Sequence, residues 1–212
     1  MTILFDLDGT LIDSTEAILE SFHNSYRIFG LPSPKDADIK SLIGHPLDVM
    51  YSSLGVEEKI VWDMVDAYKE HYREISREKT ILLPYAKEAI ELASQHARVG
   101  IVTTKTGKYS KILMEHFNVM QHFEILVGRE DVTNPKPHPE PIQKAIDFLS
   151  VSKDDCWMIG DTRMDLISAK NAGVKSVAVV SEYEAVEELK KHTDIIKTNA
   201  LEAVRTILDR KI

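Results

Sequence analysis

Short apolar segments rich in Val and Ile recur along the chain and predict buried strands. They cover residues 3–5, 98–103, 123–128, 156–160 and 174–180. Each segment is almost uniformly apolar rather than alternating, which is typical of a strand covered on both faces. Helical spacing of apolar residues separates the last four segments, over 107–117, 138–149 and 162–172. Strands that alternate with helices predict an α/β fold, with a doubly wound parallel sheet between two layers of helices.

Residues 14–82 have a different pattern and predict an all-helical insertion. Ser14 is a candidate N-cap, and the apolar residues after it recur every three or four positions until Gly30 and Pro32. A second run with the same spacing covers residues 60–72, and no strand pattern lies between the two runs. We therefore expect a core domain made of residues 1–13 and 83–212. The helical domain, residues 14–82, is expected to be inserted after the first strand.

Composition narrows the classes of function. The chain has 212 residues with 43% apolar and 28% charged residues, which is the balance of a folded globular protein. Its net charge of −8 argues against nucleic-acid partners and anionic membrane surfaces, which require a basic face. A single cysteine, Cys156, excludes an intramolecular disulfide and a cysteine zinc cluster. The apolar runs are too short to span a membrane, and the first ten residues lack a signal-peptide pattern, so we expect a cytoplasmic protein.

Polar residues stand where the predicted strands end. Asp6 and Asp8 follow the first strand, Thr103 and Thr104 follow the second, and Asp161 follows the fourth. Ligands of open parallel sheets bind at the carboxyl ends of strands, so we expect these side chains to meet there. Carboxylates that lie so close repel each other unless a cation sits between them or one is protonated. Oxygen ligands suit Mg²⁺, whereas no His or Cys spacing supports zinc.

A phosphoryl group would complete this constellation. Lys136 and the Thr103 hydroxyl, with backbone amides near Gly9 and Thr104, could hold its oxygens, because phosphoryl transfer depends mostly on positioning and charge neutralisation. A carboxylate nucleophile can form an aspartyl phosphate, which water then hydrolyses. The second carboxylate could protonate the leaving alkoxide and later deprotonate the water.

These residues resemble the motifs of a known family. The motifs are Asp6-Leu7-Asp8-Gly9-Thr10-Leu11, then Thr103, then Lys136 in Lys-Pro-His-Pro-Glu-Pro, and finally Gly160-Asp161 with Asp165. In this order they are similar to the four motifs of the haloacid dehalogenase-like superfamily, and the resemblance extends over essentially the whole chain. It implies a Rossmann-like core with an inserted helical cap. The segments DGTLIDS, KPHPEP and GDTRMD look like those of its phosphoglycolate phosphatase and pyrophosphatase group.

The resemblance also implies roles for the acidic residues. Asp6 would be the nucleophile and a magnesium ligand. Asp8 would be the general acid and base and would offer its backbone carbonyl to the metal, which places it in the metal site with Asp6 and Asp161. Asp165 would not bind the metal directly, and it would be hydrogen-bonded to Lys136 or to a water on the metal.

The same resemblance implies roles for Thr103 and Lys136, whereas Thr104 and His45 are candidates from their positions along the chain. Thr103 and Lys136 would bind the phosphoryl group, with Thr104 beside them, and Lys136 would also restrain Asp6. The turn that contains His45 is the candidate part of the cap that reaches the substrate. Two segments depart from the pattern of close relatives. Residues 103–105 are Thr-Thr-Lys rather than Thr-Asn-Lys, and residues 180–183 replace an aromatic-glycine element.

The expected function is a Mg²⁺-dependent phosphatase that hydrolyses a small, phosphoglycolate-like metabolite through an aspartyl phosphate, as a monomer or homodimer. An inorganic pyrophosphatase and a β-phosphoglucomutase-like phosphotransferase are the alternatives within the superfamily. Haloacid dehalogenases lack the second aspartate, so Asp8 argues against that reaction. Phospho-signalling receiver domains share the aspartyl phosphate but have ~120 residues and no helical insertion. The length and the insertion therefore argue against a receiver domain.

Overall fold

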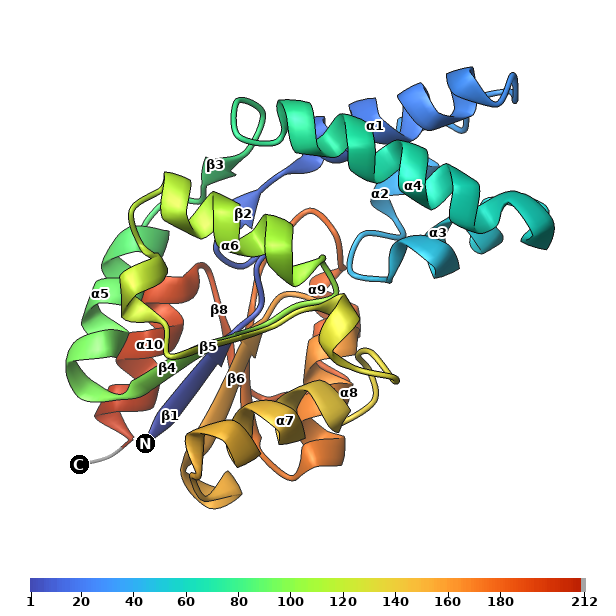
Figure 1. Cartoon of the computed structure of the whole chain (residues 1–212). Coiled ribbons are helices and arrows are strands. Elements are labelled where there is room, and N and C mark those ends of the chain that lie inside the picture. The colour runs from blue at the N-terminus through green and yellow to red at the C-terminus, as the bar shows by residue number, and fades with distance from the viewer. Residues whose placement is uncertain (211–212) are drawn as a thin grey trace. The chain divides into compact units, whose positions relative to one another are not determined.

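The chain folds into two compact units. One consists of Met1–Asp13 and the chain from Leu82 onward, and the other is Ser14–Ile81. The computed structural model describes residues 1–210, and Figure 1 labels its elements. The strands are β1 Thr2–Phe5, β2 Ile12–Asp13, β3 Ile81–Leu82, β4 Arg98–Val102, β5 Ile125–Val127, β6 Cys156–Gly160, β7 Lys175–Val179 and β8 Ile196–Lys197. The helices are α1 Thr15–Ile28, α2 Asp36–Lys40, α3 Leu47–Ser53, α4 Glu58–Ile75, α5 Ala86–His96, α6 Gly107–His116, α7 Glu140–Leu149, α8 Arg163–Ala172, α9 Val186–Leu189 and α10 Ala200–Asp209, with short 3-10 turns η1 Met120–His122, η2 Arg129–Asp131 and η3 Lys153–Asp155.

The first unit is built on a parallel sheet of six strands. Their order is β5-β4-β1-β6-β7-β8, and each printed pair is parallel. The chain therefore adds strands outward from β1 on one side, then returns and adds strands on the other. This strand order is that of a doubly wound sheet, and it confirms the expected α/β fold class. The switch point lies between β1 and β6, where ligands of such sheets bind.

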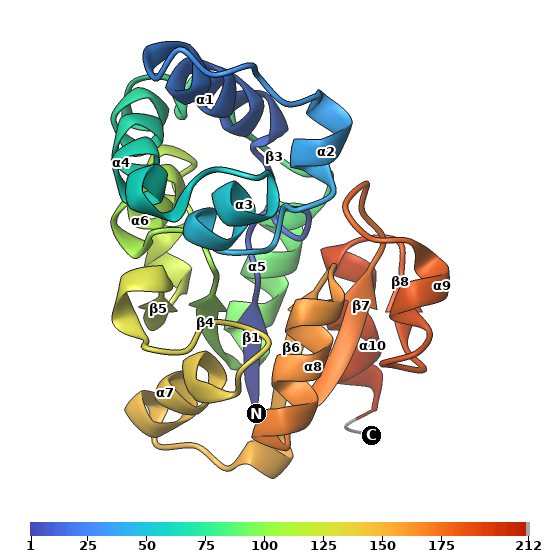
Figure 2. The ribbon, with the colours of Figure 1, turned by 90° about the vertical axis from the view of Figure 1, so that its right-hand side faces the viewer.

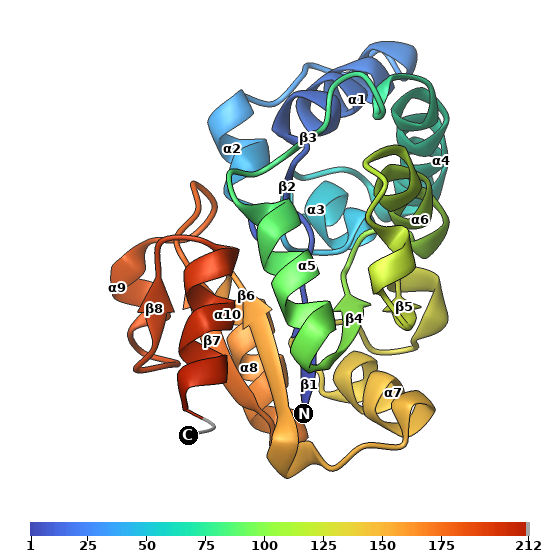
Figure 3. The same cartoon turned by 90° about the vertical axis from the view of Figure 1, so that its left-hand side faces the viewer.

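Helices cover both faces of this sheet. Helices α7 and α8 lie on the face shown in Figure 2, and α5 and α10 lie on the opposite face shown in Figure 3. Within β1, Ile3 and Phe5 join the apolar cluster under α5 and α10, whereas Leu4 joins the cluster under α7 and α8. Because successive side chains of a strand point to opposite faces, a strand covered twice is apolar at most of its positions. Cys156 lies in the second cluster, and burial raises the pKa of its thiol to about 12.

Several elements differ from the expected ones. Strand β8 has only two residues, which is too short for a period-two pattern to be recognised. Helices α5 and α10 were not among the expected elements. Leu82, expected in the helical insertion, belongs to the first unit, and the boundary between the units falls within β3, which pairs with β2.

The second unit contains α1 to α4. Helices α1 and α4 pack along each other through buried apolar faces, as their three-and-four spacing predicts. Aromatic rings fill the interior, where Phe22 of α1 contacts Tyr51 and Tyr68. The Tyr51 hydroxyl shares a hydrogen bond of 2.6 Å with the Ser25 hydroxyl. In the described chain, residues 1–210, no helix combines the length and apolar character needed to cross a membrane.

Candidate active site

Asp6 lies at the carboxyl end of the central strand. Phe5 pairs with Ile101 of β4 and Ile159 of β6, and the Asp6 amide donates to the carbonyl of Ile159 at 2.9 Å. The residue is only 5% exposed. The sheet therefore fixes the backbone of Asp6 on both sides, and the next residues of β4 and β6 lead directly to Thr103 and Asp161.

A tight turn follows Asp6 and returns the chain to β2. The Leu7 carbonyl accepts hydrogen bonds from the amides of Thr10, Leu11 and Ile12. Gly9 has φ +80°, and a Cβ atom there would lie 2.1 Å from Oδ2 of Asp161. Only glycine fits this close approach with this backbone conformation. The Thr10 hydroxyl donates to Oδ1 of Asp161 at 2.9 Å, so the turn from β1 is joined to the end of β6.

Lys136 is a buried cation between two carboxylates. Its Nζ lies 2.8 Å from Oδ1 of Asp6 and 2.5 Å from Oδ1 of Asp165, and it donates to the Val102 carbonyl at 3.0 Å. Burial by itself would lower the pKa of Lys136, but Asp165 and Asp6 more than offset this effect and raise it. The ammonium therefore stays charged and holds the Asp6 carboxylate in place, which is the restraint that the sequence predicted.

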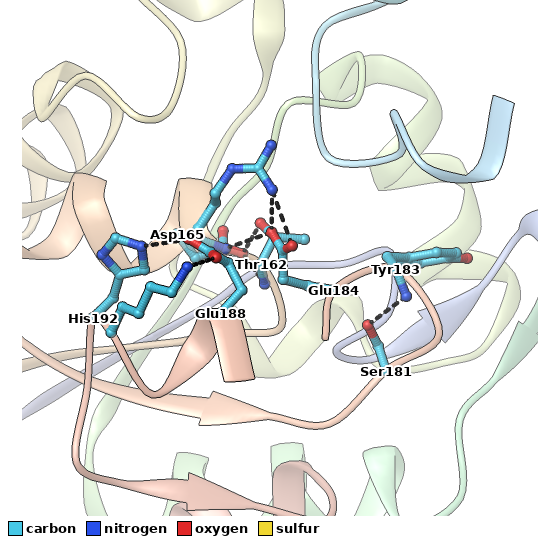
Figure 4. Close-up of polar contacts among 9 residues, drawn as sticks. Thr162, Asp165, Ser181, Tyr183, Glu184, Glu188 and His192 are labelled. Atoms are coloured by element: carbon cyan, nitrogen blue, oxygen red, sulfur yellow. Dashed lines mark hydrogen bonds and ion pairs between the residues drawn. The ribbon is translucent and has the colours of Figure 1, made fainter. Parts of the chain in front are cut away.

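Asp165 anchors the start of α8. Its Oδ2 accepts hydrogen bonds from the Thr162 amide at 3.1 Å and the Thr162 hydroxyl at 2.8 Å, as Figure 4 shows. This reciprocal capping arrangement satisfies free amides at the helix N-terminus. Gly160 makes room for it, because a Cβ at residue 160 would lie 2.3 Å from the Asp165 side chain. Both oxygens of Asp165 are thus engaged, one by Lys136 and the other by Thr162.

Three buried carboxylates form a group that could hold a metal ion. One oxygen each from Asp6, Asp161 and Asp165 lies within 4.8 Å of the others. Burial, with contributions from neighbouring carboxylates, raises the pKa of Asp6 to about 7 and that of Asp161 well above its usual value. Oδ2 of Asp161 is buried and accepts no hydrogen bond from the described residues. All three side chains offer carboxylate oxygens, and one of these oxygens is buried without a hydrogen bond. Such a set of ligands fits a hard divalent cation such as Mg²⁺.

The Asp8 carboxylate differs from the other acidic residues. The family resemblance places Asp8 at the metal through its backbone carbonyl, and that contact stays a prediction. The Asp8 side chain is not part of the three-carboxylate group. Its Oδ2 instead lies 3.1 Å from Nζ of Lys105, a residue that was not among the expected site residues. This contact joins the turn after β1 to the loop after β4.

Thr103 and Thr104 follow β4 next to Asp6. Thr103 is buried, its amide donates to the Val127 carbonyl at 3.0 Å, and its hydroxyl accepts from the Lys105 amide at 3.2 Å. Thr104 is half-buried beside it. Their contact with a phosphoryl group stays a prediction.

The loop after β7 also borders the site. The ring of Tyr183 lies against Gly9, because a Cβ at residue 9 would be 2.7 Å from Cδ2 of that ring. The Tyr183 amide donates to the Ser181 hydroxyl at 3.0 Å, and Glu184 forms a double contact with Arg163 of α8 at 2.7 and 2.9 Å (Figure 4). Sequence reasoning noted this segment only as a departure from the family pattern. No local pattern relates residue 183 to residue 9.

His45 belongs to the second unit. It lies between α2 and α3, directly after Gly44, whose φ is +102°. The His45 amide donates to the Leu42 carbonyl at 3.0 Å, and the residue is half-buried. Its role in substrate specificity stays a prediction.

Comparisons with known proteins agree with this geometry. The family model for haloacid dehalogenase-like hydrolases matches residues 3–179. Pyrophosphatase PpaX of Bacillus cereus is 34% identical over 182 residues, which cover 84% of this chain and 82% of the relative. A structure named as a haloacid dehalogenase-like hydrolase from Bacteroides fragilis has a TM-score of 0.90 at 29% identity, covering 95% of this chain and 98% of its own.

A more distant structure shares the fold. It is named as a predicted phosphoglycolate phosphatase from Haemophilus somnus, with a TM-score of 0.87 at 22% identity over 97% of this chain and 96% of its own. The matched residues include every motif of the site from Asp6 to Asp165. The chain belongs to the haloacid dehalogenase-like hydrolases.

Proposed function

We propose that this hydrolase is a Mg²⁺-dependent phosphatase that acts on a small phosphorylated metabolite through an aspartyl phosphate, an acyl phosphate formed on Asp6. The observation that carries the proposal is the buried ion-pair arrangement of Asp6, Lys136 and Asp165 beside Asp161. A structural role alone would not explain three carboxylates and one lysine buried together, because burying charges is costly.

Asp6 is the nucleophile of the proposed reaction. Lys136 holds one of its carboxylate oxygens, which leaves the other oxygen to attack phosphorus. Attack forms the Asp6–phosphate bond and breaks the bond from phosphorus to the leaving oxygen. Water then attacks the phosphoryl group and releases inorganic phosphate, which restores the Asp6 carboxylate.

Asp8 handles the proton in both steps. It follows Asp6 by two residues on the same turn, and its Oδ2 lies 3.1 Å from Nζ of Lys105. It gives a proton to a leaving alkoxide and later takes one from the attacking water. Such proton transfer typically accelerates a reaction by ~10²–10⁴-fold.

Asp6 and Asp161 are the side chains that would hold Mg²⁺. Asp161 contributes its unsatisfied Oδ2, whereas Asp165 is already engaged with Lys136 and Thr162. When bound, the ion would neutralise charge on the phosphoryl oxygens and reduce the repulsion between these carboxylates. Thr103 and Lys136 would bind the remaining phosphoryl oxygens.

Two substrate classes fit the proposal. The first is a small organic phosphate such as phosphoglycolate, as the motif segments suggest. The second is inorganic pyrophosphate, which is supported by the 34% identical relatives named pyrophosphatase PpaX. Both present a terminal phosphoryl group to Asp6. A β-phosphoglucomutase-like transfer stays an alternative with no specific support among the described residues.

A substrate panel tests the proposal directly. The purified protein would be assayed for phosphate release with Mg²⁺ against pyrophosphate, phosphoglycolate, sugar phosphates and p-nitrophenyl phosphate. We expect turnover that is lost in excess chelator and restored by Mg²⁺.

The Asp6→Asn variant tests the nucleophile. We expect it to lose turnover, because an amide is a poor nucleophile, whereas Asp147→Asn on the exposed face of α7 is the matched control. Acid-quenched protein incubated with labelled substrate should carry label in the parent protein and none in Asp6→Asn. Turnover of Asp6→Asn near that of the parent protein would place the nucleophile elsewhere.

A further inference from the structure

A second lysine, Lys105, lies at the strand ends next to Asp8. Its Nζ is 3.1 Å from Oδ2 of Asp8, and the two side chains are only 10% and 13% exposed. Lys136 serves Asp6 and Asp165, so the two lysines serve different carboxylates. The site therefore has one cation beside the nucleophile and another beside the acid–base residue.

Hydrogen bonds fix the backbone at Lys105 and just after it. Its carbonyl accepts from the Arg129 amide at 3.0 Å, and its amide donates to the Thr103 hydroxyl at 3.2 Å. Just after it, the Glu130 carboxylate accepts from the amides of Gly107 and Lys108 at the start of α6. These contacts join the loop after β4 to the loop after β5. The ammonium group therefore extends from a supported backbone rather than from a free surface loop.

The position of Lys105 has an electrostatic consequence for the leaving group. The acid–base residue must lie next to the leaving oxygen, so a cation in contact with Asp8 also lies near the leaving group. Solvent is largely excluded from both side chains, and charge interactions there are stronger than in bulk water. A leaving group that carries negative charge is stabilised at this place, whereas a neutral alcohol gains little.

We propose that Lys105 recognises the leaving group, and that the substrates are phosphates whose leaving group is itself an anion. This inference rests on the proposed function and narrows it. The shared chemistry is an anionic group next to the transferred phosphoryl, which either the second phosphate of a diphosphate or the carboxylate of a phosphorylated hydroxy acid supplies. Lysine suits this role as a compact point charge with rotatable donors.

The test compares substrates within each variant. Lys105→Met removes the charge, Lys105→Arg retains it, and Lys111→Met alters an exposed lysine of α6 as the control. We would measure kcat and KM with Mg²⁺ for pyrophosphate, phosphoglycolate, glycerol phosphate and p-nitrophenyl phosphate. Because hydrogen bonds to charged groups contribute ~1.5–3 kcal/mol, we expect Lys105→Met to lose ~10–100-fold more kcat/KM on the anionic leaving groups than on glycerol phosphate.

The substrate ratios decide between roles of Lys105. The expected loss resides mainly in KM and is partly restored in Lys105→Arg. The two anionic substrates distinguish a diphosphate enzyme from a phosphorylated-acid enzyme by which of them the parent protein prefers. A loss on glycerol phosphate as large as on the two anionic substrates would show that Lys105 only supports Asp8 and would overturn the proposal, as would no loss.

A binding measurement separates this proposal from the proposed function. Calorimetry would compare methylenediphosphonate with inorganic phosphate, both in the presence of Mg²⁺. We expect Lys105→Met to weaken methylenediphosphonate at least tenfold more than phosphate, and equal weakening would contradict the role of Lys105. A parent protein without turnover on any phosphate would reject the phosphatase, while this binding difference would still decide the role of Lys105.

Discussion

Gly9 shows how a single backbone position holds this site together. It turns the chain directly after Asp8, and its missing side chain leaves room for Oδ2 of Asp161 and the ring of Tyr183. Any other residue would meet both the strain of a positive φ and a direct clash. The glycine is therefore a requirement of the site, beyond the needs of a tight turn.

We expect Gly9→Ala to lose turnover and to destabilise the protein by more than ~1–3 kcal/mol, the usual cost of such a backbone conformation. Gly55→Ala is a matched control, because Gly55 has φ +82° but a Cβ there would meet nothing within 4 Å. Chemical denaturation and the phosphatase assay measure both variants. Equal destabilisation in the two proteins would show that the clash with Asp161 has no effect.

At the scale of elements, the cap at the N-terminus of α6 supports the loop that carries site residues. The Glu130 carboxylate, which lies in η2, accepts hydrogen bonds from the Gly107 amide at 2.8 Å and the Lys108 amide at 3.2 Å. A carboxylate at this place satisfies free amides and interacts favourably with the helix dipole. It also fixes the loop that carries Thr103 and Lys105.

Glu130→Ala should therefore destabilise the protein by ~1 kcal/mol, as loss of a helix cap does. It should also lower kcat/KM, because the loop after β4 loses its support. Glu115→Ala, near the other end of α6, removes only an exposed pair with Lys111 and should change stability by less than ~0.5 kcal/mol. Denaturation curves and kinetics would be recorded together, and unchanged kinetics in Glu130→Ala would mean that the loop keeps its conformation without the cap.

The turn between α2 and α3 is the helical unit's candidate for specificity. We expect His45→Ala to change the order of preference among substrates more than it changes hydrolysis of p-nitrophenyl phosphate, because a residue that contacts the leaving part does not act on a simple aryl ester. His116→Ala, exposed at the end of α6, is the control. The measurement is kcat/KM over the substrate panel, and a uniform effect would assign specificity to another segment.

At the scale of the whole molecule, the buried carboxylates make stability depend on the metal. Asp6, Asp161 and Asp165 lie together, and among the contacts described above Lys136 alone supplies positive charge to this group. A cation that binds only the folded state stabilises it by RT ln(1 + c/Kd), where c is its free concentration, so the gain grows with the logarithm of c above Kd. We expect millimolar Mg²⁺ to raise Tm.

Asp161→Asn should abolish most of this Mg²⁺ effect, and in excess chelator it should melt at or above the Tm of the parent protein because one buried charge is gone. Asp147→Asn should behave like the parent protein. Thermal melts with and without Mg²⁺ supply the measurement. A full Mg²⁺ effect in Asp161→Asn would place the ion at other residues.

The sequence by itself determined the local and repetitive features of this protein. Mostly apolar segments predicted the five longer strands, because strands buried on both faces place apolar side chains on each of them. The helical insertion was readable from its three-and-four spacing. Asp6, Thr103, Lys136 and Asp161 were recognisable because parallel strands bring their carboxyl ends to one edge, and the motif order added their roles.

Only the tertiary structure decided which side chains meet. It separated the Asp8 carboxylate from the metal group and paired it with Lys105, and it brought Tyr183 against Gly9 across more than 170 residues of sequence. It also bonded Asp165 to Thr162, in addition to Lys136, which was one of the two partners that the family resemblance implied. Such contacts depend on the register of neighbouring strands and on the direction in which loops leave the sheet. Neither property is written in the spacing of residues along one segment, so no local pattern could have predicted them.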